Sequence, residues 1–148
     1  MTRAGSPAPD DAARARAVRG LALAARSLEQ AAGDLTLAQY RVLAMVSAGD
    51  ERASLLAGRL AVTKPSVSAV VDGLVERGHL AREPVNGDRR AVRLTMTREG
   101  TKALAAAEAA MAERLEPLVV AIDDRAAFVR GLDEMHAVLR ERFRTRAQ

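Results

Sequence analysis

Two short helical segments, followed at once by a segment that alternates in polarity, constrain the fold of this chain more than any other feature. Residues 54–60 and 63–77 each carry apolar side chains at helical spacing, and a turn of about three residues joins them. Residues 80–85 suit a strand, and Asn-Gly-Asp at 86–88 is a strong turn signal. Residues 91–96 then alternate with the period of two that is typical of a half-buried strand. A β-hairpin directly behind two short helices predicts a winged helix-turn-helix.

Longer helices are predicted on both sides of this region, and capping residues indicate where they start. These capping residues are Asp10 or Asp11, Thr36, Thr97 and the pair Asp123-Asp124. In the helix that begins after Thr36, one face is expected to be apolar. Its members are Leu37, Tyr40, Leu43 or Ala44, and Ser47.

We expect a single intertwined domain that is mainly α with a small β-hairpin wing. Residues 1–10 form a flexible leader, and residues 11–33 a dimerisation helix. Residues 34–97 form the winged helix-turn-helix, and residues 98–146 the C-terminal dimerisation helices. Because about residues 36–96 suffice to close the core of the winged helix, the flanking helices need a further partner.

Apolar seams on the long helices indicate what that partner is. The seams repeat at roughly 3.5 residues, which favours helix–helix packing of the coiled-coil type. A second copy of the chain is the simplest partner, because a two-fold dimer places two recognition helices about 34 Å apart on one face of a duplex. The residues assigned to the dimer interface are Val18, Leu21, Leu28, Leu115, Leu118, Phe128, Leu132, Leu139 and Phe143. The alternative is a monomeric six-helix domain that buries these seams internally.

Composition excludes several classes of function. The 148 residues suit one domain, and no window approaches the ~18 uninterrupted apolar residues of a membrane span. Cysteine is absent, which excludes disulfides, Cys-ligated zinc and thiol-based redox sensing. His79 and His136 stand far apart, so we expect neither an enzyme nor a metal or cofactor site. No secretory signal is recognisable at the N-terminus, and the expected location is cytoplasmic.

The net charge of +4 lies in one short segment. Between Arg77 and Arg98 there are six arginines and two acids, whereas the rest of the chain has 17 basic and 17 acidic residues. Arginine offers a planar, permanently charged fork that suits phosphates and base edges. The aromatic residues Tyr40, Phe128 and Phe143 lie off this segment, which argues against recognition of RNA or single strands by stacking. Double-stranded DNA is therefore the expected partner.

The start of the second short helix and the hairpin supply the expected DNA contacts. On the helix these are Thr63, Lys64, Ser66, Ser68 and Ala69, and on the wing Asp88, Arg89, Arg90 and Arg93. A helix N-terminus attracts phosphate, hydroxyl groups match base edges, and Ala69 can meet a thymine methyl. Ordinary solvent exposure and capping explain the two serines equally well. Asp88 is expected to orient a neighbouring arginine, and Arg82 and Arg93 to face phosphates.

Taken together, residues from about 12 to 145 resemble the MarR family of bacterial transcriptional regulators. The matching stretches are residues 35–43, 56–62, 63–74 and 76–82, then Asp88-Arg-Arg90 and residues 92–100, where the family pattern is D-x-R, an alternating strand and L-T-x-x-G. The resemblance implies a homodimer that binds a pseudo-palindromic operator, usually as a repressor. It also implies release of the DNA by a small effector, often aromatic or phenolic, bound between the dimer helices and the winged domain.

The resemblance assigns roles to some residues and departs at others. Arg90 takes the place of the wing arginine that enters the minor groove, and Asp88 that of its partner acid. Ala69 and Gly73 stand where the family often has basic residues, so the recognition helix is poor in charge. Tyr40 is a candidate for the effector pocket between the first, second and fifth helices, although a core position with a satisfied hydroxyl explains it better. The alternatives are a regulator without small-molecule input and a helical interaction module that has lost operator binding.

Overall fold

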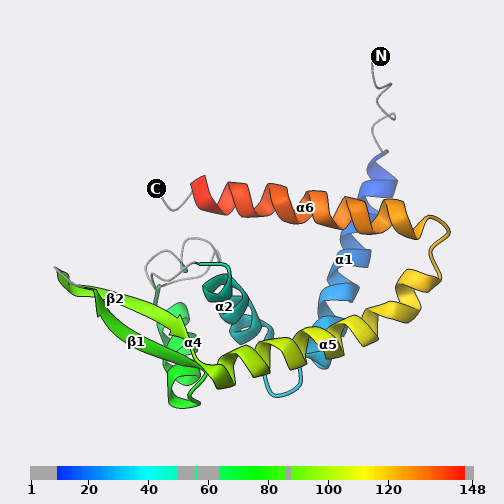
Figure 1. Ribbon diagram of the computed structural model, residues 1–148. Helices are drawn as coiled ribbons and strands as arrows, with labels where there is room; N and C mark the ends of the chain where they lie inside the picture. The colour runs from blue at the N-terminus through cyan, green and yellow to red at the C-terminus, as the bar shows by residue number, and fades with distance from the viewer. Residues whose placement is uncertain (1–9, 50–55, 57–63, 86–87, 146–148) are drawn as a thin grey trace.

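The computed structural model describes residues 10–49, 56, 64–85 and 88–145 of the chain. Within these residues it has five helices and one two-stranded antiparallel sheet (Figure 1). The elements in chain order are α1 (Asp11–Ala31), α2 (Leu37–Ser47), α4 (Lys64–Glu76), β1 (Leu80–Val85), β2 (Asp88–Met96), α5 (Arg98–Val120) and α6 (Arg125–Thr145). The fold is mainly α with a β-hairpin wing, as the sequence predicts. The helix predicted at residues 54–60 lies outside the described residues, apart from the buried Leu56.

Side-chain caps fix where the helices begin. The side chains of Asp10, Thr36 and Thr97 each accept a hydrogen bond from the backbone N–H three residues further on. At Thr36 the cap is reciprocal, because the Gln39 side chain accepts a hydrogen bond of 2.9 Å from the Thr36 N–H. Asp124 accepts a hydrogen bond of 2.9 Å from a backbone N–H in the first turn of α6. These caps confirm the predicted starts of the helices and set the wing directly in front of α5.

One hydrophobic core joins α2, α4, the wing and the first half of α5. Its buried members are Ala32, Leu35, Val42, Leu43, Val46, Leu56, Val67, Val71, Leu74, Leu80, Leu94, Leu104, Ala107 and Met111. The prediction that residues 36–96 close this core by themselves is wrong, because Leu104, Ala107 and Met111 of α5 complete it. A movement of α5 would therefore be transmitted directly to the winged helix-turn-helix through the shared core.

The buried face of α2 differs in part from the predicted one. Leu43 is fully buried as predicted, but Val42 and Val46 are buried beside it. Ser47 is exposed, and Tyr40 is half-buried. The physical reason is that α2 packs against α4 and the wing as well as against α5, so its buried arc is wider and turned relative to a single stripe.

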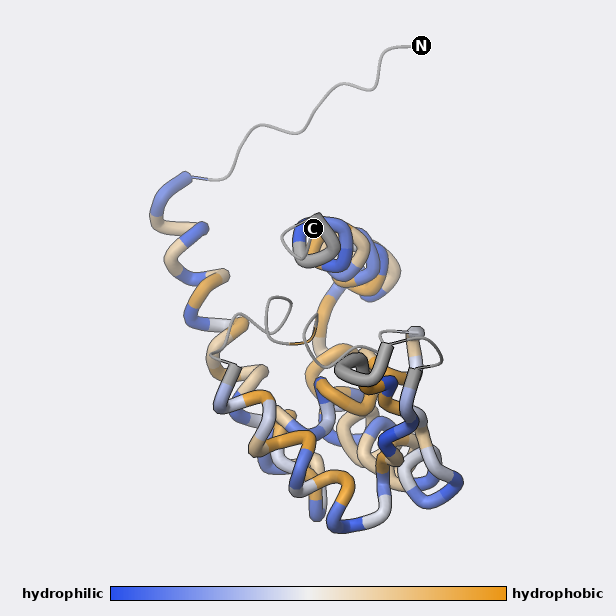
Figure 2. The backbone as a smooth tube through the Cα atoms, turned by 90° about the vertical axis from the view of Figure 1, so that its left-hand side faces the viewer, coloured by the Kyte–Doolittle hydropathy of each residue, from blue (hydrophilic) through white to orange (hydrophobic). Residues whose placement is uncertain are grey.

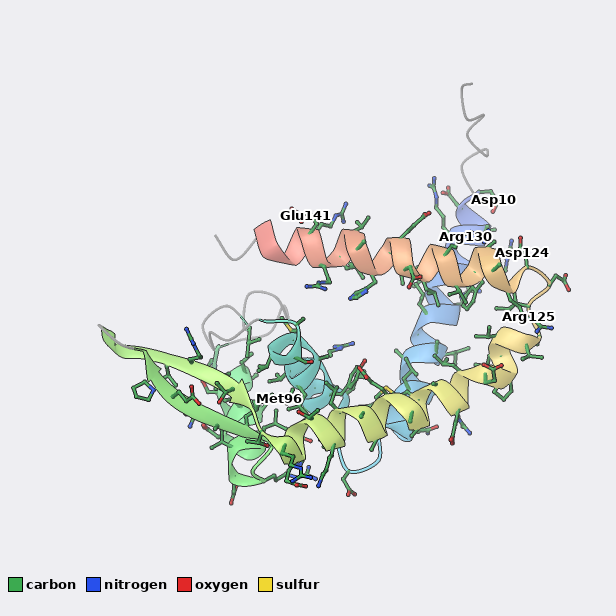
Figure 3. All side chains as sticks on the ribbon, in the orientation of Figure 1. Asp10, Met96, Asp124, Arg125, Arg130 and Glu141 are labelled. Atoms are coloured by element: carbon green, nitrogen blue, oxygen red, sulfur yellow. The ribbon has the colours of Figure 1, made fainter. Side chains whose placement is uncertain are left out.

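The long helices extend away from this core (Figure 1). None of the residues of α1 is buried, although this helix packs against α5. Figure 2 shows apolar residues recurring along α1 and along α6, which stands apart from the body of the chain. From the turn at Asp124 and Arg125, α6 runs back in the direction opposite to α5 (Figure 3). The contacts that α6 makes within its own chain are chiefly with α5. The long helices thus expose apolar side chains that a single chain does not cover.

Candidate nucleic-acid interface

Helix α4 presents one face to the core and the opposite face to solvent. Val67, Val71 and Leu74 are buried, with exposed fractions of 3% or less. The predicted contact residues Ser66, Ser68 and Ala69 are exposed over the first turns of the helix, and so is Asp72 one turn further on. Lys64 is the first residue of α4, and its side chain lies outside the described part of the structure. Thr63 lies outside the described residues altogether.

The wing is longer and less regular than the predicted hairpin. β1 and β2 pair from Leu80 opposite Met96 as far as Pro84 opposite Val92, and Val85 then pairs with Asp88. Residues 89–91 of β2 therefore have no partner of their own in the register, which makes this part of the strand a bulge. Pro84 lacks the N–H that a continuous ladder needs, which accounts for the irregularity at this point.

This register corrects the predicted positions of the wing arginines. The sequence places Arg89 and Arg90 between the turn at residues 86–88 and a strand over residues 91–96. The strand instead begins at Asp88, so both arginines belong to the bulged outer end of β2. Their side chains and that of Asp88 lie outside the described part of the structure. A bulge changes the direction in which the side chains of a strand point. The backbone at Arg89 and Arg90 therefore differs from that of the regular strand.

The alternation predicted for β2 holds only near the body of the protein. Leu94 is fully buried, but Val92 is 41% exposed although it was predicted on the same buried face. The reason is position along the hairpin, because the pair of Pro84 and Val92 lies beyond the core that covers Leu94. Arg93 is exposed and lies opposite Glu83 on β1. At Val92 and Arg93 the wing therefore extends beyond the part of the sheet that the core covers.

The root of the wing is fixed to the start of α5. The Thr97 hydroxyl donates to the carbonyl oxygens of Gly78 and His79, at 2.6 and 3.1 Å, and accepts from the Gly100 N–H at 2.9 Å. A Cβ atom at Gly100 would lie 2.0 Å from the His79 carbonyl oxygen. Only glycine allows the helix to approach the backbone so closely. Thr97 and Gly100 of the matched motif thus hold the wing root in place.

An ion pair joins the exposed face of α4 to the wing. The Arg82 guanidinium on β1 donates from Nη2 to Oδ1 of Asp72 on α4. Sequence reasoning placed Arg82 against phosphate and passed over Asp72. The signal was present, because Asp72 follows Ser68 by four residues and Ala69 by three, which places it on the same helical face.

A cavity of about 310 Å³ lies where the α1–α2 connection meets α5. It is lined by residues 32–35, by Arg77 and His79 from the junction of α4 and β1, and by Ala103, Ala106, Ala107 and Ala110 of α5. Arg77 Nη1 donates to the Asp34 carbonyl oxygen at 2.8 Å. His79 Nδ1 is buried and has no hydrogen-bond partner among the described residues.

Tyr40, the predicted pocket candidate, does not line this cavity. It packs partly against the hydrophobic core, which agrees with the core position that the sequence also favours for it. Burial raises the pKa of its phenol, and the nearby Glu108 carboxylate raises it further. The hydroxyl therefore stays protonated through the neutral pH range.

The MarR family model matches residues 33–91, a stretch that includes α2, α4, β1 and the first residues of β2. Over this stretch the chain is similar to the MarR family. MarR proteins are DNA-binding transcriptional regulators with a winged helix-turn-helix and are not enzymes, and the described residues have the same kind of fold. Among curated proteins, no sequence matches the chain.

Solved structures of MarR-type regulators share the fold over most of the chain. A MarR-family transcriptional regulator from Rhodococcus sp. RHA1 is 21% identical, with a TM-score of 0.72, 90% of this chain and 96% of that chain covered. CouR from Rhodococcus jostii, bound to p-coumaroyl-CoA, is 22% identical with a TM-score of 0.69 and the same coverage of 90% and 96%. A mutant MarR from E. coli complexed with operator DNA is 21% identical, with a TM-score of 0.65 and coverage of 82% and 91%.

Among the described residues, no helix is both long and apolar enough to cross a membrane. No group of three or more histidine, aspartate or glutamate side chains gathers there in a way that would hold a metal ion.

Proposed function

We propose that the protein is a homodimeric, cytoplasmic repressor that holds a pseudo-palindromic operator and releases it when a small effector binds. The observation that carries the proposal is the division of the chain into two surfaces. One is the exposed face of α4 with the wing beside it, and the other is the uncovered apolar surface of the long helices.

The DNA-facing surface is made of α4 and β2. Ser66, Ser68 and Ala69 read base edges in the major groove, and the N-terminus of α4 with Lys64 binds the neighbouring phosphates. Arg89 and Arg90, at the bulged end of β2, reach the adjacent minor groove. The E. coli relative complexed with operator DNA supports this use of the fold. Since the α4 residues are short and uncharged, the wing carries much of the electrostatic attraction.

The apolar surface supports a dimer. Leu118 on α5 is 53% exposed and Val138 on α6 is 55% exposed. The other large apolar side chains exposed on the long helices are Val18, Leu21, Leu23, Val120, Phe128, Val129, Met135 and Leu139. Of the predicted interface residues, Leu115 and Leu132 are half-buried, Leu28 packs against its own core, and the Phe143 side chain lies outside the described part. A monomer that buried these seams internally would not leave so many apolar side chains exposed.

The cavity beside α5 supports an effector site. Its alanine floor accepts an apolar body, while the Arg77 guanidinium at its edge suits a negatively charged or carbonyl group. It lies between the α1–α2 connection and the junction from α4 to the wing, so a bound molecule would act on both. CouR bound to p-coumaroyl-CoA is a relative of the same fold with a bound small molecule. A regulator that responds to abundance alone is the second candidate.

Sedimentation and electrophoretic shift together test the proposal. We expect a dimer mass at micromolar concentration and a shift with duplex DNA from upstream of the protein's own gene. A monomer mass would refute the dimer, and no shift even at low salt would favour a helical interaction module instead. Screening small aromatic acids for thermal stabilisation, with DNA release as the readout, separates an effector-controlled repressor from one without small-molecule input.

A further inference from the structure

The exposed face of α4 carries a negative charge where a DNA-binding surface needs none. Asp72 lies on the same face as Ser68 and Ala69, and its side chain is 60% exposed. A carboxylate beside the phosphates of a duplex raises the free energy of the complex by like-charge repulsion. Arg82 of β1 pairs with this carboxylate, and its own side chain is 44% exposed. A surface that only attracted DNA would not include this carboxylate, so the ion pair of Asp72 and Arg82 requires another explanation.

We propose that Arg82 is a positioning residue for DNA binding, which neutralises Asp72 and ties the wing to the recognition helix, rather than a phosphate contact. The proposal rests on operator binding by α4 and the wing as described above. It assigns to Arg82 and Asp72 a joint role, in which the pair as a whole presents no net charge to the DNA.

The position of Arg82 along the hairpin supports this role. Arg82 pairs in the sheet with Leu94, which is fully buried, whereas the next two pairs outward contain the exposed Arg93 and Val92. Arg82 thus stands at the boundary between the part of the wing held by the core and the part that projects. A contact from this point to α4 therefore sets the angle between the wing and the recognition helix. Further out along the hairpin, the core no longer holds the wing.

Chemistry also favours the pair over a phosphate contact. An arginine with a carboxylate at hydrogen-bond distance already has a charge-assisted partner of the kind that phosphate would offer. Moving Arg82 onto a phosphate would leave Asp72 unpaired on the surface that faces the duplex. Because both side chains are partly exposed, the pair contributes little to folding stability. Variants at either position should therefore fold, which leaves DNA binding as the quantity that changes.

A double-mutant cycle tests the proposal, with DNA affinity and its salt dependence as readouts. The variants are Arg82→Ala, Asp72→Asn and the double variant, each titrated against a labelled duplex from upstream of the gene and against a mixed-sequence duplex. We expect Arg82→Ala to weaken binding by on the order of tenfold, as one uncompensated charge close to phosphate requires. The double variant should recover to within about threefold of wild type, with an unchanged slope of log affinity against log salt.

A direct phosphate contact predicts the opposite result. The double variant would then bind as weakly as Arg82→Ala, and its salt slope would be smaller by about 0.9 per protomer. Either finding would overturn the proposal. If the wild-type protein bound neither duplex, the proposed function itself would be refuted. If the wild-type protein bound DNA but the double variant did not recover, only the role of Arg82 would be refuted.

The ion pair of Arg26 and Glu29 on α1 provides the matched control. It is also exposed, and its atoms are 3.5 Å apart. Arg26→Ala and the double variant Arg26→Ala/Glu29→Gln should each bind the mixed-sequence duplex within about twofold of wild type, because α1 lies away from α4 and the wing (Figure 1). A tenfold loss and rescue at this pair as well would show a general charge effect and refute a specific role for Arg82.

Discussion

Replacing Gly100 with alanine tests whether the wing root is as rigid as its geometry indicates. A Cβ atom at this position would lie 2.0 Å from the His79 carbonyl oxygen and 2.8 Å from the Met96 sulfur. Ordinary contacts between such atoms are about 3.5 Å, so the His79 backbone or the start of α5 must move by about 1.5 Å. The obstacle is backbone rather than a flexible side chain, which places the cost at the upper end of the range for overpacking.

The magnitude follows from what that movement breaks. Overpacking a close-packed site costs about 1–3 kcal/mol, and the His79 carbonyl also accepts hydrogen bonds from the Thr97 N–H and hydroxyl, at 3.2 and 3.1 Å. Losing part of these bonds adds about 1 kcal/mol. We therefore expect Gly100→Ala to lower the free energy of unfolding by about 3 kcal/mol or more. For a chain of this size that is a fall in Tm of roughly 6–12 °C.

Gly73→Ala is the matched control, because it also places alanine in a helix of the same module. Its Cβ would meet only the end of the Gln39 side chain, at 3.9 Å. Alanine is a better helix former than glycine, so we expect an increase in stability of about 0.5–1 kcal/mol. Thermal unfolding followed by circular dichroism at one protein concentration measures both variants. If Gly100→Ala stayed within about 0.5 kcal/mol of wild type, the backbone at the wing root would be yielding and the rigidity argument would be refuted.

Substitutions at three other positions test the remaining parts of the molecule. Arg90→Ala should weaken operator binding and reduce the salt slope by about 0.9 per protomer, and an unchanged affinity and slope would remove Arg90 from the interface. Thr36→Ala removes a reciprocal cap and should cost about 1 kcal/mol in chemical denaturation, whereas Thr36→Ser should cost far less. Because the pKa of Tyr40 is raised in the folded protein, the unfolded state loses its proton first, so stability should fall as pH rises through and above 10.0. Tyr40→Phe should flatten that decline, and an equal decline in both proteins would show that another group is responsible.

Local signals in the sequence were sufficient to predict most element boundaries. Thr36 and Thr97 cap helices because a side-chain oxygen reaches the N–H three residues on, which depends on nothing outside that turn. The hairpin is likewise predicted by the turn signal at residues 86–88 and by the alternating polarity of residues 91–96. The bulged register of β2 was not predictable in this way, because it depends on which residues of β1 and β2 pair across the sheet.

Features that depend on contacts between distant segments of the chain could not be predicted from the sequence. The buried arc of α2 and the contribution of Leu104 and Met111 to the core arise because α2 meets three other elements. The pairing of Asp72 with Arg82 needs the angle between α4 and the wing, which no spacing along the chain gives. The cavity edged by Arg77 is a further case, since it combines residues 32–35 with an α5 face more than sixty positions away.

The structure places the six arginines of the basic segment in different parts of the molecule. Of the six between Arg77 and Arg98, Arg77 binds the α1–α2 connection and Arg82 is matched by a carboxylate from outside the segment. Those at 89, 90 and 93 lie on β2, and Arg98 is the first residue of α5. Half of the arginines of this segment thus lie on one strand of the wing. Because α4 itself offers mainly short polar side chains, the proposed function assigns base recognition to α4 and most of the electrostatic attraction to the wing. Their relative angle then decides whether both can act on one duplex, which is why the contact between Asp72 and Arg82 matters more for binding than for folding.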